Sequence, residues 1–164
     1  MKPLTEQEIR TAFVNCTKGE AKRLSIPRDL AERPWEDLDF LGWRDPQAPD
    51  RAYLVTLLDD RPVGVQLRAS TGGGAGQARR SMCTVCLTTH SGGVSLLVAP
   101  KAGKAGQQGN SVGVYMCDDL ACSLYLRGRK DAGVGGRLQE SLTREEEIAR
   151  TEANLAAFLA KVTD

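Results

Sequence analysis

Four of the five cysteines in this 164-residue chain stand in two closely spaced pairs, and these pairs constrain the fold more than any other feature. Cys83 and Cys86 form a C-x2-C pair, and Cys117 and Cys122 form a C-x4-C pair. Zinc favours four tetrahedral thiolate or imidazole ligands, which two pairs brought together by an intervening hairpin supply. We therefore expect these four side chains to bind one zinc ion.

The two pairs occupy the positions expected in a treble clef. The first precedes a predicted strand at 94–100, and the second joins a predicted strand at 111–116 to a predicted helix at 118–130. Backbone amides and the helix dipole stabilise thiolates at such a junction. Four protein ligands leave no position for water, so the metal is expected to be structural.

Other uses of these cysteines are less favoured. Disulfides are disfavoured in a cytosolic chain, and the Cys86 segment runs into glycines rather than opening a thioredoxin-like helix. An iron–sulfur cluster also takes four cysteines, and spacing alone leaves it open. His90 is the single histidine and a candidate replacement ligand, but four cysteines favour a polar role outside the ligand set. Cys16 is expected to be a small buried apolar group.

The rest of the chain predicts helices around a hairpin. Helices are expected at 5–16 and 143–162, since each begins with a capping box of threonine and a glutamate three residues later. Segments 51–58 and 63–68 read as two strands joined by a short turn. The stretch 33–50 is predicted to form a short helix or turn followed by a loop, with its aromatics in the core: Trp35, Phe40 and Trp43.

These elements predict an α+β fold in a single domain spanning 1–164. A helical N-terminal part covers 1–50, the hairpin and treble clef cover 51–137, and a C-terminal helix covers 138–164. Glycine-rich loops at 70–77 and 101–110 lack the Gly-Lys-Ser/Thr ending of a phosphate-binding loop.

Charge is distributed unevenly along the chain. Residues 79–137 carry eight basic and three acidic side chains, net +5, whereas 138–164 carry three basic and six acidic, net −3. A zinc ion with four thiolates lowers the +5 to about +3. A basic segment of this kind fits RNA or an acidic protein, and equally fits a solvated basic surface.

Several functional classes are disfavoured by the sequence. No apolar run approaches the roughly 18 residues that span a bilayer, and the first residues lack a signal peptide's apolar centre. We expect a cytoplasmic protein with no membrane partner. One histidine and a closed metal site also argue against an enzyme, and no small-molecule substrate is expected.

The order of several motifs resembles the treble-clef zinc-finger domain of the elongation-factor-G-binding proteins, the fusidic-acid-resistance family. The motifs are FVNCTKGEAKRLSIP, WEDLDFLGWRDP, RAYLV, PVGVQLR, MCTVC and CDDLAC, covering most of residues 9–130. The resemblance implies a non-enzymatic protein whose zinc finger binds elongation factor G and helps it leave the ribosome when fusidic acid has trapped it. Resistance proteins of the family carry a helical bundle ahead of this domain, and a histidine ligand where this chain has Cys117.

Basic and aromatic groups beside the metal are the predicted partner contacts. They are Arg79, Arg80, Tyr115, Tyr125, Arg127, Arg129 and Lys130. The alternative function is a ribosome-associated protein that binds ribosomal RNA through the basic members of this set. The sequence lacks the alternating aromatic and basic residues of a single-strand platform, which disfavours RNA.

Overall fold

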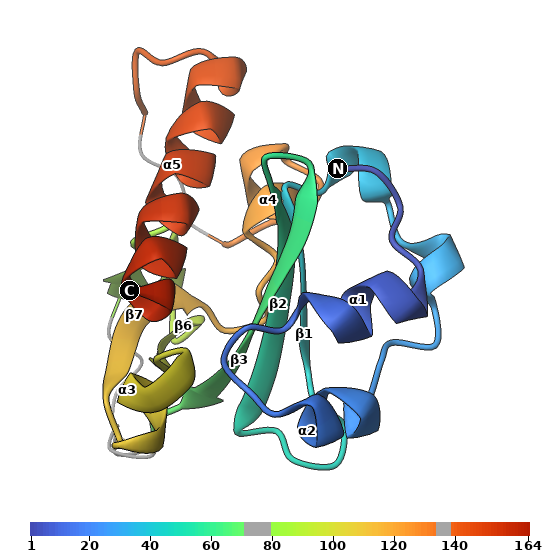
Figure 1. Cartoon of the computed structure of the whole chain (residues 1–164). Helices are drawn as coiled ribbons and strands as arrows, with labels where there is room; N and C mark the ends of the chain where they lie inside the picture. The colour runs from blue at the N-terminus through green and yellow to red at the C-terminus, as the bar shows by residue number, and fades with distance from the viewer. Residues whose placement is uncertain (71–79, 134–138) are drawn as a thin grey trace.

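Figure 1 shows the computed structural model of the chain, which describes residues 1–70, 80–133 and 139–164. Its centre is a five-stranded antiparallel sheet in the order β1-β2-β3-β6-β7. The strands are β1 (Phe40–Arg44), β2 (Arg51–Leu58), β3 (Arg61–Ala69), β6 (Val94–Pro100) and β7 (Ser111–Cys117). A separate two-stranded sheet pairs β4 (Arg80–Met82) with β5 (Thr89–Ser91).

The described residues also form four short helices and one long C-terminal helix. They are α1 (Glu6–Ala12), α2 (Lys18–Arg23), α3 (Gly103–Gln107), α4 (Cys122–Leu126) and α5 (Arg144–Thr163), with 3-10 turns at Leu30–Glu32 and Trp35–Asp37. Capping boxes at Thr5 and Thr143 confirm the predicted helix starts, and α2 begins with a third at Thr17. Among the described residues, no helix is long and apolar enough to cross a membrane.

The central sheet separates two hydrophobic cores, as the helices on either side of it show in Figure 1. One face of β1 and β2 packs against α1 and α2 through Leu41, Trp43, Tyr53 and Val55. The opposite face of the sheet packs against the cysteine segment and α5, whose buried side chains are Leu155, Phe158, Leu159 and Val162. This arrangement of helices, antiparallel sheet and C-terminal helix confirms the α+β class.

The predicted hairpin is formed by β2 and β3, and its turn consists of two aspartates. Asp59 and Asp60 have φ values of 48° and 60°. Positive φ at both central residues is the signature of a type I′ turn, whose twist matches that of the flanking strands. The turn therefore fixes the register that places Arg51 opposite Arg68 at the other end of the hairpin.

The prediction of a loop after Trp35 was wrong, because Phe40–Arg44 forms the edge strand β1. Adjacent Phe40 and Leu41 are both buried, one in each core. A strand covered on both faces loses the alternation of apolar and polar residues that identifies strands in a sequence. The core role of Trp35, Phe40 and Trp43 is confirmed, since all three are buried.

Three further boundaries differ from expectation. The first helix ends at Ala12, and α4 covers only Cys122–Leu126 of the predicted 118–130. The loop at 101–110 contains α3. The glycine-rich residues 71–77 lie outside the described part of the chain.

The segment after α1 closes a gap in the sheet, because β3 and β6 pair only at two positions, Arg68 and Ala69 of β3. Beyond them, the Asn15 amide donates to the Gln66 carbonyl (2.9 Å) and accepts from the Gln66 amide (2.8 Å). The same amide group donates to the Pro100 carbonyl at 3.0 Å. One side chain thus satisfies backbone groups on both strands, which would otherwise lack partners.

Candidate metal centre

The four paired cysteines converge on one buried point. Their Sγ atoms all lie within 4.8 Å of one another. Sγ of Cys83 is 3.7 Å from that of Cys122, and Sγ of Cys86 is 3.5 Å from that of Cys117. Zinc–sulfur bonds of about 2.3 Å in a tetrahedron place sulfurs about 3.8 Å apart, so the cluster fits a single ion. This geometry leaves no room for a cluster of several irons between the sulfurs.

The first knuckle is a tight turn from Cys83 to Thr88, between β4 and β5. The Cys86 amide donates to Sγ of Cys83 at 3.4 Å, and the Leu87 amide donates to the Cys83 carbonyl at 2.9 Å. Leu87 has a φ of 58°, a backbone conformation that residues other than glycine rarely adopt. The turn therefore brings the two sulfurs close together and places a backbone N–H donor beside Cys83. This donor favours the thiolate form of Cys83 over the thiol.

The second knuckle connects the end of β7 to the start of α4. The Leu120 amide donates to the Cys117 carbonyl at 2.9 Å, and Leu120 has a φ of 55°. The Asp119 carboxylate accepts from the Ala121 amide at 3.0 Å and from the Tyr125 hydroxyl at 2.8 Å. The left-handed residue explains why the helix begins at Cys122 and not at 118.

The thiols share one another's hydrogen bonds in this cluster. Hydrogen bonds from Cys117, Cys122 and Cys86 lower the pKa of Cys83, whereas burial raises the pKa of Cys122. Buried thiolates repel one another, and a divalent cation removes that repulsion and the desolvation cost together. The donor set therefore suits zinc, and its four sulfurs complete the tetrahedral shell.

His90 lies beside the cluster and not within it. The group of potential metal ligands consists of the four cysteine sulfurs. The His90 Nε2 atom lies outside this group, 3.3 Å from Sγ of Cys117. The His90 ring packs edge-on against Tyr125, with centroids 4.6 Å apart. An imidazole N–H in this position can donate to the Cys117 sulfur and so stabilise its negative charge.

Gly42 of β1 lets Leu120 of the second knuckle pack directly against the sheet. A Cβ at Gly42 would come closer to the Leu120 Cβ than two carbon atoms ordinarily approach. We predict that Gly42→Ala lowers the free energy of unfolding by about 2 kcal/mol, as overpacking of a core does. Chemical denaturation of the zinc-loaded protein measures this change. Gly19→Ala, where a Cβ meets only ordinary contacts, is the control and should not destabilise the protein.

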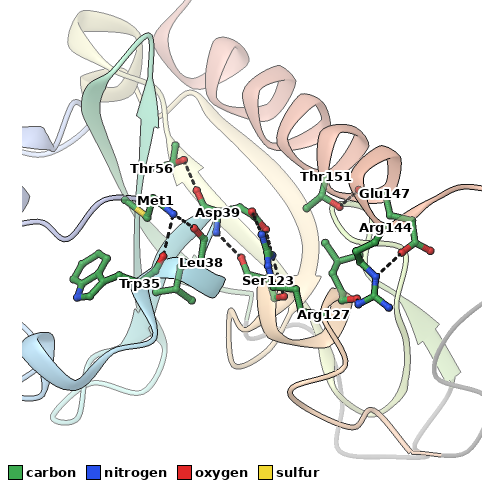
Figure 2. Close-up of polar contacts among 11 residues, drawn as sticks. Met1, Trp35, Leu38, Asp39, Thr56, Ser123, Arg127, Arg144, Glu147 and Thr151 are labelled. Carbon is green, nitrogen blue, oxygen red and sulfur yellow. Dashed lines mark hydrogen bonds and ion pairs between the residues drawn. The ribbon is translucent and has the colours of Figure 1, made fainter.

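Polar contacts also tie α4 to β1, as Figure 2 shows. Arg127 donates to both oxygens of Asp39, at 2.8 Å and 2.7 Å. The Asp39 amide donates to the Ser123 hydroxyl at 3.0 Å, and the Thr56 hydroxyl donates to the Asp39 carbonyl at 2.9 Å. Sequence reasoning missed Asp39, because its partners are distant in the chain and no local pattern marks them.

The predicted partner contacts fall into different settings. Arg127, Arg129 and Lys130 form ion pairs with Asp39, Asp37 and Asp119, respectively. Tyr125 is buried, whereas Tyr115 is 53% exposed. Arg79 lies outside the described residues, and Arg80 is placed only by its backbone in β4. Among the described candidates, Tyr115 is therefore the exposed aromatic residue, and the Arg129 side chain is 65% exposed despite its ion pair.

A four-cysteine cluster held by one knuckle at a β-turn and another at a strand-to-helix junction defines the chain as a treble-clef zinc-binding protein. The chain belongs to the family described as FBP C-terminal treble-clef zinc-finger, whose model matches residues 8–162. This match confirms the family resemblance and the structural zinc predicted from the cysteines. No curated protein and no solved structure matches the chain.

Proposed function

We propose that this protein binds elongation factor G and promotes its release from the ribosome, as the fusidic-acid-resistance family does. The observation that carries the proposal is the family match over residues 8–162. The zinc centre supports a binding role, because its four sulfurs leave no ligand position for a substrate. The protein then acts in the cytoplasm as a non-enzymatic partner of the factor.

The factor-binding surface in this proposal is centred on Tyr115, on the outer face of β7. The Tyr115 carbonyl accepts from both the amide and the hydroxyl of Thr84, at 2.8 Å and 2.9 Å. Thr84 lies between Cys83 and Val85 in the first knuckle, so zinc binding positions the backbone beneath Tyr115. Half-buried Leu96 lies opposite Tyr115 on β6, and exposed Met82 ends β4. Aromatic side chains in such apolar surroundings are typical interface anchors.

Basic residues at the end of α4 would contribute less. Arg127 is mostly buried in its bidentate ion pair with Asp39 and so has little surface for a partner. Arg129 and Lys130 remain exposed despite their ion pairs. We retain Arg79, Arg80, Arg129 and Lys130 as peripheral contacts, with Tyr125 and Arg127 supporting the fold beneath them. RNA binding at the finger is correspondingly less favoured, because three of its five predicted cations already have carboxylate partners.

Binding of the zinc-loaded protein to its own organism's elongation factor G, measured by calorimetry, tests the proposal. We predict that Tyr115→Ala weakens binding about tenfold, as loss of an aromatic anchor does. Val14→Ala also truncates an exposed apolar side chain, and should change affinity less than about twofold because Val14 follows α1. Absence of wild-type binding at micromolar concentration would refute factor binding. Equal effects of the two variants would refute only the proposed surface.

A further inference from the structure

Three arginines converge on a small pocket away from the cysteine cluster. Arg23 ends α2, Arg51 begins β2, and Arg68 lies near the end of β3. Together they line a pocket of about 280 Å³, whose other lining residues are Glu20, Leu24, Asp45, Tyr53 and Gln66. None of these residues belongs to the zinc centre or to the surface around Tyr115.

Two of the arginines lie opposite each other on neighbouring strands. Arg51 and Arg68 are direct partners in the β2–β3 ladder, so their side chains share one face of the sheet. Like charges directly opposite on antiparallel strands are destabilising. In the described parts of the chain, no carboxylate forms an ion pair with Arg23, Arg51 or Arg68. An anion in the pocket would relieve this repulsion.

The two acids of the pocket are hydrogen-bonded to neighbouring groups, and Glu20 also interacts electrostatically with Arg23 and Arg51. One Glu20 oxygen accepts from the amide and the hydroxyl of Thr17, both at 2.8 Å, and these bonds lower the pKa of Glu20. Buried Asp45 accepts from the Tyr53 hydroxyl at 3.0 Å and the Gln47 amide at 2.9 Å. Burial and Asp45 raise the pKa of Tyr53 to about 12, so this hydroxyl remains a donor at neutral pH. The pocket therefore holds three guanidinium groups against two carboxylates, a net charge of +1 that favours an anionic ligand.

We infer that this pocket binds a phosphate group, either as free phosphate or as part of an RNA backbone. Guanidinium forks match phosphate oxygens in bidentate geometry, and three of them converge here. The pocket has room for a phosphate but offers no open aromatic face for a base, because the Tyr53 ring is buried. The inference does not depend on factor binding and concerns a different surface.

Titration of the full zinc-loaded chain with inorganic phosphate tests the pocket, using arginine Nε–H NMR signals and the thermal midpoint. Arg51→Gln with Arg68→Gln should abolish the phosphate-induced shifts and the rise in Tm that ligand binding produces. The double variant without phosphate should keep or raise its Tm, since like-charge repulsion is removed. Arg28→Gln with Arg61→Gln removes the same charge at exposed positions outside the pocket, and should retain the phosphate response.

A fluorescently labelled single-stranded RNA distinguishes the two sources of phosphate. Loss of RNA affinity at least tenfold in the pocket variant, but not in the control variant, would identify an RNA backbone as the ligand. Phosphate binding at the arginines without RNA binding would identify free phosphate. An absent phosphate response in the wild type, or equal loss in both double variants, would overturn the inference, and neither result bears on binding of elongation factor G.

Discussion

Replacing Cys117 and Cys122 together with serine should abolish zinc binding and unfold the half of the protein that surrounds the cluster. All four cysteines lie within the larger core, together with Leu97, Met116 and the apolar face of α5. Structural zinc supplies roughly 10 kcal/mol or more in zinc-finger peptides, which is comparable to the entire stability of a typical domain. Loss of the metal therefore removes more free energy than the remaining contacts of this core can replace.

The fifth cysteine provides a matched control for this experiment. Cys16 is half-buried in the smaller core, outside the zinc site, and Cys16→Ser should keep one equivalent of zinc and change stability by about 1 kcal/mol or less. Elemental analysis gives the metal content, and thermal unfolding followed by circular dichroism gives the stability. A Cys117→Ser, Cys122→Ser protein that keeps the wild-type Tm would show that the core does not depend on zinc.

The zinc centre could be predicted because the residues that identify it are close together in the sequence. Spacing within each pair, together with the strand at 94–100 and the strand-to-helix junction at Cys122, identifies the two knuckles without knowledge of the remaining fold. Capping boxes at Thr5 and Thr143 are local in the same sense, since each involves residues only three apart. The polar and apolar alternation of β7 is equally visible, because one of its faces is open at Tyr115.

The features that escaped prediction depend on distant residues. Strand β1 lacks alternation because cores lie on both of its faces, and the bridging role of Asn15 requires Gln66, which is 51 residues away. The net charge of 79–137 overstates how basic the surface of this segment is, because residues outside it pair with some of its arginines. Arg127 and Arg129 are neutralised by Asp39 and Asp37, which belong to the N-terminal part of the chain.

The Asp39–Arg127 pair is the main ionic link between this N-terminal part and the helix that carries Cys122. The two residues are 88 positions apart, and their side chains are 5% and 17% exposed. The hydrogen bonds that Arg127 donates to Asp39 raise the pKa of Arg127, so the guanidinium stays charged at any pH the protein tolerates. Breaking one partner of such a pair leaves the other charge buried without compensation.

We predict that Asp39→Asn lowers the free energy of unfolding by about 3 kcal/mol, because a neutral amide turns N–H donors toward a guanidinium that has only donors. Asp118→Asn is the matched control: Asp118 pairs with Arg44 but is 51% exposed, and its loss should cost less than about 1 kcal/mol. Urea denaturation measures both changes. Metal content should remain at one zinc, which separates a weakened link from a lost metal. Equal losses in the two variants would contradict the role of burial.

Replacing both partners, as Asp39→Leu with Arg127→Met, removes the buried charge as well as the bond and should cost less than Asp39→Asn alone.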